Sequence, residues 1–380
     1  MNNIFSHNEV IRIKKAVYYD IAPIPLPKPF KDGTGGIRKA SFFNGWLKLY
    51  DQDGNCGQGP ASQLFVDFFL PRLLKEEGKS NGEWINYFWW EIRNFGYQSP
   101  HVAELCSLDW ILLDLLALRA KKPLHRFLGA KRDWARVYKG GGSVLDDDET
   151  LIEELLRFKE EGYTTTKFKV GGYGTKICGD IRRLEKVRRA LGDGMEIAVD
   201  ANQAWDADTA FHFVSEAKDY SVAWLEEPVH AYDMDALWSL RDNMNQSRIT
   251  MQIAMGESVR SYHTHVAYVE HGVDHLQPAR LCSLSEIMHV REYAHQNNCM
   301  VSTGGFPFQT AVLGTLYSEE ELIEYHQPLN EVLVPYFSLV SEMREGRFYL
   351  PDEPGLPVKM DFQRLERDGL LKGIRYFYHE

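Results

Sequence analysis

The sequence has few cysteines, no long apolar segment and no apparent export signal. Five cysteines are scattered over 380 residues, with an odd total and no close pair. This spacing argues against a disulfide framework or a cysteine-based zinc site, and it favours a reducing cytoplasm. The most apolar stretch, LDWILLDLLAL, carries Asp109 and Asp114 and is too short to span a bilayer. Residues 1–15 lack the apolar core of a signal peptide, so we expect a cytoplasmic protein without a membrane partner.

Positive charge is also in short supply. The formal net charge is −11, with 43 basic and 54 acidic residues, which disfavours nucleic acid and anionic membrane surfaces as partners. The composition of 44% hydrophobic and 26% charged residues is ordinary for a soluble globular protein. A small anionic substrate remains possible, because a bound cation can reverse the local field.

The length predicts two domains rather than one. Residues 1–130 begin with alternating β-rich segments and a hairpin whose turn is at 51–54, and a helical pattern follows from 65 to about 128. We interpret this part as an α+β capping domain. The proline-rich residues 22–36 are expected to form an exposed loop. The segment 341–380 is expected to pack back on the capping domain.

Residues 131–340 show a different rhythm, in which short apolar segments alternate with amphipathic helical ones. The β-like segments are VYKGG, TTTKFKV, EIAVD, AWLEEP, ITMQIAMGE, VDHLQP, CMVST and LIEY. Eight strands with a helix between each successive pair fit closure into a barrel with right-handed crossovers. The predicted fold class is therefore α/β, a modified TIM barrel of (β/α)7β type.

Three successive strands of this barrel end in a carboxylate. Asp200, Glu226 and Glu257 follow one another at intervals of 26 and 31 residues. Any one of them could simply cap the next helix, but that reading does not explain three strands that end alike. The ends of barrel strands meet on one face, so we expect a carboxylate cluster of the kind that binds Mg²⁺.

Two lysines precede this series on the strand before it. Lys167 and Lys169 are two residues apart and point to the same side of their strand. They could be exposed lysines on an edge strand. In a barrel interior two ammonium groups are costly without an anionic partner, and the three acidic strand ends provide one, so we favour a functional pair.

Together, the motifs K-x-K, D-A-N, L-E-E-P and G-E-S resemble the enolase superfamily, specifically its mandelate racemase/muconate lactonizing branch. LDWILLDLLALRAKKPLHRFLGA is similar to the end of that family's capping domain, and REGRFYLPDEPGLPVKMD to its closing segment. The resemblance implies that Asp200, Glu226 and Glu257 hold Mg²⁺, which binds a substrate carboxylate. It also implies an enediolate intermediate, formed when the proton α to that carboxylate is removed.

The resemblance implies roles for the remaining site residues as well. Lys169 would be the general base, and Lys167 would favour the neutral form of Lys169 and help polarise the carboxylate. Glu324 occupies the eighth-strand position that contacts the substrate carboxylate. Asn202 and Arg280 are further candidates for substrate binding, since a guanidinium suits an anionic or hydroxyl group. A homo-oligomer is expected on the same basis.

The sequence departs from the family pattern on the sixth and seventh strands. Residues 277–280 read Gln-Pro-Ala-Arg and residues 302–305 read Ser-Thr-Gly-Gly, without the lysine or the aspartate–histidine pair that the family places there. His275 is expected to be a packing or surface residue. A racemase that needs a proton donor on each face of the substrate is therefore disfavoured.

These features lead to three hypotheses. The first is a Mg²⁺-dependent lyase, a dehydratase that acts on a sugar acid or related hydroxy acid, because a single lysine can remove the α-proton and return it to the leaving hydroxyl. The second is an epimerase or cycloisomerase of the same superfamily. The third is a metal-binding barrel that has lost catalysis, against which the intact lysine pair argues. Substrate specificity is expected to lie in the loops around residues 23–36 and 53–63.

Overall fold

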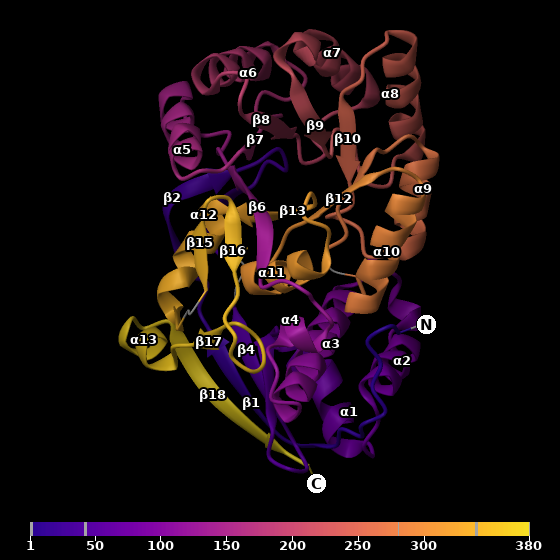
Figure 1. The fold of residues 1–380 in the computed structure, drawn as a ribbon, viewed down its shortest axis with the longest axis vertical. Coiled ribbons are helices and arrows are strands. Elements are labelled where there is room, and N and C mark those ends of the chain that lie inside the picture. Colours follow the sequence, from indigo (N-terminus) through magenta and orange to yellow (C-terminus); the bar gives the residue numbers. More distant parts are fainter. Residues whose placement is uncertain (1–2, 42–43, 280, 339–340, 380) are drawn as a thin grey trace.

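The computed structural model describes residues 3–41, 44–279, 281–338 and 341–379. These residues form a parallel β-barrel surrounded by helices and an N-terminal α+β domain that lies against it (Figure 1). The last residues of the chain return to the N-terminal domain, so the two ends of the sequence meet in one sheet.

The barrel contains eight parallel strands in chain order. They are β6 (Trp134–Gly141), β7 (Thr165–Lys169), β8 (Glu196–Asp200), β9 (Val222–Glu226), β10 (Gln252–Met255), β11 (His275–Leu276), β12 (Met300–Thr303) and β13 (Leu322–His326). Each strand pairs with the next, and β13 pairs with β6, which closes the barrel. The predicted TIM-type barrel is confirmed.

Seven helices connect these strands, as the (β/α)7β pattern requires. They are α5 (Asp148–Glu160), α6 (Cys178–Leu191), α7 (Ala207–Ala217), α8 (Met234–Gln246), α9 (Tyr262–Glu270), α10 (Leu284–Gln296) and α11 (Pro307–Leu316), with the 3-10 turn η3 (Lys218–Tyr220) after α7. Several begin at an acidic or hydroxyl cap; Asp206, for example, accepts a hydrogen bond from Thr209 N at the start of α7.

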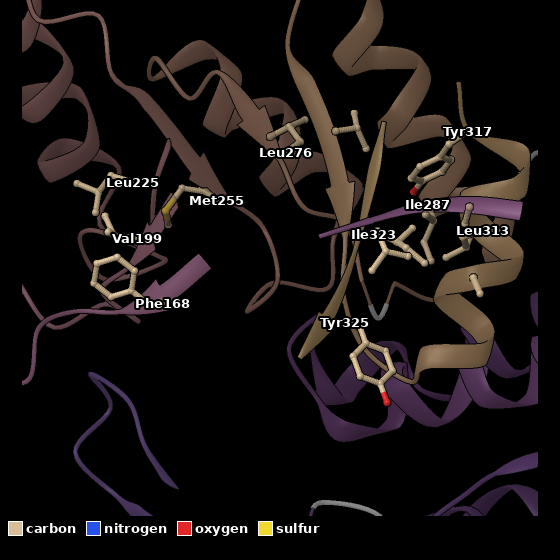
Figure 2. Packing of buried hydrophobic residues seen from close by; sticks show 14 of the residues in the cluster. Phe168, Val199, Leu225, Met255, Leu276, Ile287, Leu313, Tyr317, Ile323 and Tyr325 are labelled. Carbon is tan, nitrogen blue, oxygen red and sulfur yellow. The ribbon is translucent and has the colours of Figure 1, made fainter. Parts of the chain in front are cut away.

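The alternation of side chains along each strand separates the site from the core. On β7, β8 and β9, Phe168, Val199 and Leu225 are fully buried and belong to the large apolar cluster between strands and helices (Figure 2). Because successive strand residues point to opposite faces, the residues next to them face the barrel interior. The apolar residues thus build the core while their polar neighbours are directed to the site.

The N-terminal domain is an antiparallel sheet covered by helices. The sheet has the order β18 (Leu371–Tyr378), β1 (Ile13–Ile21), β4 (Gly45–Asp51) and β5 (Cys56–Pro60). Its helical part comprises the π-helix η1 (Phe65–Phe69), α1 (Leu70–Lys75), α2 (Asn81–Glu91), η2 (Arg93–Phe95), α3 (Pro100–Arg119) and α4 (Leu124–Phe127). The 20-residue helix α3 packs on β5 and is buried along most of its length.

The segment after the barrel contacts both domains. It contains α12 (Gln327–Asn330), η4 (Glu331–Tyr336), β14 (Phe337–Ser338), β15 (Glu342–Arg344), β16 (Arg347–Tyr349), β17 (Lys359–Met360) and α13 (Phe362–Arg367) before β18. Strand β16 pairs antiparallel with the first half of β6, and β18 pairs with β1. The chain end therefore fastens the barrel to the N-terminal sheet.

The proline-rich residues 22–36 differ from the predicted loop. Strand β2 (Pro25–Lys31) pairs with β3 (Ile37–Ala40) in a two-stranded ribbon. A two-stranded ribbon leaves each strand one free edge, so prolines that could not join a central strand are tolerated there. The prediction of an exposed loop was therefore wrong for residues 25–31, which form a strand.

The tip of the β2–β3 ribbon reaches the barrel. Val144 N donates to Lys31 O at 2.9 Å, and Lys31 N donates to Ser143 Oγ at 2.9 Å. A Cβ atom added at Gly33 would lie 2.0 Å from the carbonyl oxygen of Ala201, so only glycine permits this approach. The ribbon thus lies beside the carboxyl end of β8. By contrast, the hydrogen bonds of residues 53–55 stay within the N-terminal domain.

Among the described residues, no helix combines the length and the apolar character needed to cross a membrane. No disulfide links the cysteines of the described residues. The apolar helix that carries Asp109 and Asp114 lies inside the protein, where both side chains accept hydrogen bonds from backbone N–H groups of other segments.

Asp114 joins three parts of the chain. Its carboxylate accepts from Gln58 N at 2.8 Å and from Leu356 N at 2.6 Å, and burial raises its pKa to about 7. We predict that Asp114→Ala lowers the free energy of unfolding by about 2–4 kcal/mol, because each buried N–H left unpaired costs about 1–3 kcal/mol. Urea denaturation measures this change. The surface variant Asp368→Ala is the control, and an equally small effect of both substitutions would contradict the prediction.

Candidate active site

The register of three neighbouring strands brings the predicted lysine and carboxylates together. Lys169 on β7 pairs with Asp200 on β8, and Asp200 pairs with Glu226 on β9. Glu226 pairs in turn with Ala254 on β10, and Glu257 follows that strand by two residues. One carboxylate oxygen from each of the three acids lies within 4.8 Å of the others. The predicted carboxylate cluster is thus present in the geometry.

The two lysines lie against this cluster. Lys169 Nζ is 2.5 Å from Asp200 Oδ2. Lys167 Nζ donates to Glu226 Oε1, lies 3.6 Å from Asp200 and lies 3.1 Å from Glu324 Oε1. These two lysines and their three partners, Asp200, Glu226 and Glu324, are each less than a tenth exposed. The cost of burying the charges is offset because each one has an opposite charge beside it.

The pKa values follow from this arrangement. The two lysines outweigh burial and lower the pKa of Asp200 to about 2. Burial raises the pKa of Glu226 above its usual range, although Lys167 opposes the shift, and burial with Glu226 and Asp200 raises the pKa of Glu257 to about 8. A cation bound among these acids would take up their excess negative charge and favour their ionised forms.

The lysines hold their protons while the carboxylates are charged. Burial opposes the charged form of Lys169, but Asp200 outweighs it and raises the pKa above the ordinary lysine value. Lys167 lowers the pKa of Lys169, as the sequence suggested, yet this effect is smaller than that of Asp200. A cation bound to Asp200 would weaken the main cause of the raised pKa.

The loops after β8 and β9 have unusual backbone conformations. Asn202, Gln203 and Glu227 have positive φ angles of 42°, 63° and 40°, each of which costs about 1–3 kcal/mol in a residue other than glycine. The conformation turns Glu227 away from its neighbour Glu226, and its carboxylate accepts a hydrogen bond from Gln203 Nε2 at 3.1 Å. Glu226 lies in the carboxylate cluster, whereas Glu227 supports the loop.

Two further predicted site residues lie beside the cluster. Asn202 Nδ2 donates to Glu257 Oε1 at 3.4 Å, and its Oδ1 atom is buried without a partner among the described residues. Glu324 on β13 extends over two glycines: a Cβ atom at Gly140 would lie 2.2 Å from Glu324 Oε1, and one at Gly304 would lie 2.9 Å from Oε2. The Glu324 carboxylate therefore occupies the space that a side chain at position 304 would need. Arg280 lies outside the described residues.

The ends of β11 and β12 support the cluster through hydrogen bonds. Gln277 Nε2 donates to Glu226 Oε2 at 2.6 Å, and His275 Nε2 is 2.8 Å from Ser302 Oγ. The ring of His275 packs against Trp224 at a centroid distance of 5.0 Å. His275 is therefore a buried packing residue, as the sequence suggested. His265 is also buried, and its Nδ1 atom is bonded to Ser261 O.

Sequence reasoning missed His326. It ends β13, two residues after Glu324, and burial together with the charge of Lys169 lowers its pKa to about 4. The signal was available in the alternation of the strand, because residues 324 and 326 point to the same side.

A closed parallel barrel with an α+β capping domain, and with acidic and basic residues at its strand ends, is the architecture of a barrel enzyme whose site lies at the carboxyl face. The enolase C-terminal domain-like family model matches residues 150–364. The chain therefore belongs to the enolase superfamily, in its mandelate racemase/muconate lactonizing branch, as its motifs predicted.

Characterised relatives cover most of the chain. The L-talarate/galactarate dehydratase of Salmonella typhimurium is 30% identical over 296 residues, which are 77% of this chain and 71% of the relative. The 3,6-anhydro-alpha-L-galactonate cycloisomerase of Streptomyces coelicolor is 26% identical over 92% of this chain and 97% of the relative. The arabinonate dehydratase of Saccharolobus solfataricus is 26% identical over 81% of this chain and 83% of the relative.

Solved structures share the fold. The Salmonella typhimurium L-talarate/galactarate dehydratase, liganded with Mg and L-lyxarohydroxamate, superposes with a TM-score of 0.80 at 24% identity, covering 97% of this chain and 94% of that one. A racemase from Streptomyces coelicolor with bound magnesium gives a TM-score of 0.81 at 24% identity, covering 94% and 99%.

The raised pKa of Glu257 predicts how cation binding depends on pH. Below about pH 8 this carboxyl holds a proton that a cation must displace, so Mg²⁺ affinity should increase from about pH 6 to about pH 8 and then level off. Isothermal titration calorimetry in buffers of different ionisation enthalpy measures both the affinity and the released protons.

Two variants test the position of the site. Glu226→Gln should weaken Mg²⁺ binding by at least about tenfold, since even partners of metal ligands contribute that much. Glu196→Gln, at the opposite end of β8 where Glu196 accepts from Thr165 Oγ1, should leave the affinity unchanged. If the two variants bound Mg²⁺ with equal affinity, the cation would bind at a site other than the carboxylate cluster.

Proposed function

We propose that this protein is a Mg²⁺-dependent lyase that removes water from a hydroxylated carboxylate, such as a sugar acid, to give a 2-keto-3-deoxy acid. The observation that carries the proposal is the set of three carboxylates at the ends of β8, β9 and β10 beside the lysine pair of β7. Relatives named as talarate/galactarate, arabinonate and gluconate dehydratases support the reaction type.

Asp200, Glu226 and Glu257 are the proposed Mg²⁺ ligands. The donor set fits, because it offers only carboxylate oxygens, and three acids close together are destabilised without a cation. Bound there, Mg²⁺ would stabilise the negative charge that develops on the substrate carboxylate when the α-proton leaves.

Lys169 is the proposed general base. Its position at the end of β7, beside Asp200, would place its amine next to a carboxylate substrate held at the cluster. Lys167, deeper in the barrel and bonded to Glu226, would keep a positive charge that favours the neutral form of Lys169 and polarises the substrate carboxylate.

The remaining proposed contacts lie around the substrate. Asn202 has a buried oxygen without a partner among the described residues, and Glu324 is held by Lys167. We propose that both contact the substrate, and that Arg280 binds a distal anionic or hydroxyl group.

The second candidate function is an epimerase or cycloisomerase of the same branch. The Streptomyces cycloisomerase aligns with 92% of this chain, and a single base can serve either reaction. Solvent deuterium that enters the α-position without loss of water would favour this candidate. A barrel that has lost catalysis is less consistent with the two buried lysines, each of which forms an ion pair with a carboxylate of the cluster.

We also propose that the protein acts in the cytoplasm as a homo-oligomer. Five scattered cysteines, with no disulfide among the described residues, are consistent with a reducing compartment. The outer strand β18 exposes Ile374, Tyr376 and Tyr378 at the end of the described sheet, and exposed apolar residues on an edge strand favour association.

The assignment of Lys169 as general base predicts the loss of two measurable processes in its alanine variant. With Mg²⁺ and a panel of galactarate, talarate, arabinonate and gluconate, the wild type should form a keto acid from at least one member. Lys169→Ala should abolish both keto-acid formation and exchange of the α-proton in ²H₂O, each by at least about 100-fold, because a positioned base contributes about 10²–10⁴-fold. NMR follows both processes.

Lys186→Ala is the matched control, since Lys186 is a half-exposed lysine of α6 paired with Asp148. It should behave as the wild type. If α-proton exchange in Lys169→Ala matched that of the control, the general-base assignment would fail. No product from any sugar acid would count against the lyase.

A further inference from the structure

A dehydration needs a group that protonates the leaving hydroxyl, and the described ends of β11 and β12 offer none. Among the described residues at the ends of β11 and β12, Gln277 is bonded to Glu226, Ser302 is bonded to His275, and Gly304 has no side chain. None of these three residues has a side chain that gains or loses a proton near neutral pH. A second proton-transfer group in the described structure therefore has to come from another element.

His326 is placed to be that group. It is the last residue of β13 and lies on the same side of the strand as Glu324, which contacts Lys167 at 3.1 Å. Its partner on the next strand is Gly140, so no neighbouring side chain on β6 covers it. The strand thus directs an imidazole toward the lysines.

The ring of His326 is packed by its neighbours, but its Nδ1 atom lacks a hydrogen-bond partner among the described residues. Phe30 of the β2–β3 ribbon packs edge-on against the ring of His326, with ring centroids 5.1 Å apart. Nδ1 is buried and has no hydrogen-bond partner within the described part of the chain. His275 and His265 each have one ring nitrogen bonded to the protein, although the other nitrogen, like Nδ1 of His326, is buried without a partner among the described residues. A buried polar group without a partner requires an explanation.

The charges that act on the ring are those of the active site. Burial comes first and lowers its pKa, Lys169 and Lys167 lower it further, and Glu324 and Asp200 oppose them. His326 therefore lies in the electrostatic field of the reacting groups. The negative charge of a bound acid would act in the same direction as Glu324 and favour the imidazolium.

We propose that His326 is a second acid/base residue of this site, which transfers a proton to the leaving hydroxyl of the substrate. The inference rests on the proposed dehydration. Neutral Lys169 accepts the α-proton, and the bond from the β-carbon to its hydroxyl oxygen breaks with the electron pair on oxygen. The imidazolium of His326 gives that oxygen a proton, so water leaves. The enol becomes the keto acid, and both side chains return to their initial protonation states through solvent.

The test separates the two half-reactions on whichever sugar acid of the panel the wild type uses. His326→Gln and His326→Asn retain a polar side chain but cannot transfer this proton. Each should lower keto-acid formation by at least about 100-fold and leave α-proton exchange in ²H₂O in place. His295→Gln, on the outer face of α10 beside Glu321, is the control and should change neither.

Two results would overturn the inference. Either the His326 variants form keto acid at the wild-type rate, or they lose exchange and elimination to the same extent, which would assign His326 to the α-proton instead. A folded far-UV spectrum and an unchanged thermal midpoint of the variants show that the comparison is valid.

A binding readout keeps the inference separate from the proposed function. In protein labelled at histidine, the ring signals of His326 are identified by their absence from His326→Gln. They should move when galactarate and Mg²⁺ are added together, and signals that stay in place with an acid that binds would contradict the inference. A wild type that converts no sugar acid refutes the lyase, whereas active wild type with unaffected variants refutes only the role of His326.

Discussion

The pairing of Lys169 with Asp200 and of Asp200 with Glu226 across three parallel strands is the constraint on which the site depends. Register fixes the height of each side chain in the barrel, and a shift by one residue would turn every one of them to the helix-covered face. The apolar residues between them prevent such a shift. Phe168, Val199 and Leu225 are fully buried under the helices, so the core that stabilises the barrel also sets the positions of the lysines and carboxylates.

The buried lysines and carboxylates depend on one another, because each group balances the charge of the other. Lys167 contacts carboxylates from three different strands, and without it the buried acids would repel one another. Without the acids, the buried lysines would be strongly disfavoured. The strained residues Asn202 and Glu227 add further cost beside the cluster. A fold optimised for stability alone would avoid both features, and their presence here is typical of a site that is organised for a cation and an anionic ligand.

Much of the fold and of the site could be predicted from the sequence. Asp200 and Glu226 each close a β-like run, so a strand period of two and the convergence of barrel strands were enough to bring them together. The ribbon of residues 25–40 could not be predicted, because the prolines that mark it are compatible with a loop and its pairing is decided by contact with the barrel. The space that Gly140 and Gly304 leave for Glu324 is equally invisible in the sequence, since it depends on two strands that are far apart along the chain.

The β2–β3 ribbon contacts two parts of the proposed site. Gly33 approaches the backbone just beyond Asp200, and Phe30 packs on His326, so one segment contacts both the carboxylate side and the imidazole side of the barrel mouth. Loops on a rigid scaffold can vary without loss of the scaffold, which lets the barrel retain its cluster while the ribbon changes. In this chain, however, a change in the ribbon also moves the support of His326. Under the proposed roles of the ribbon and of His326, selection for a new acid would act on both together, because Phe30 and Gly33 belong to one segment.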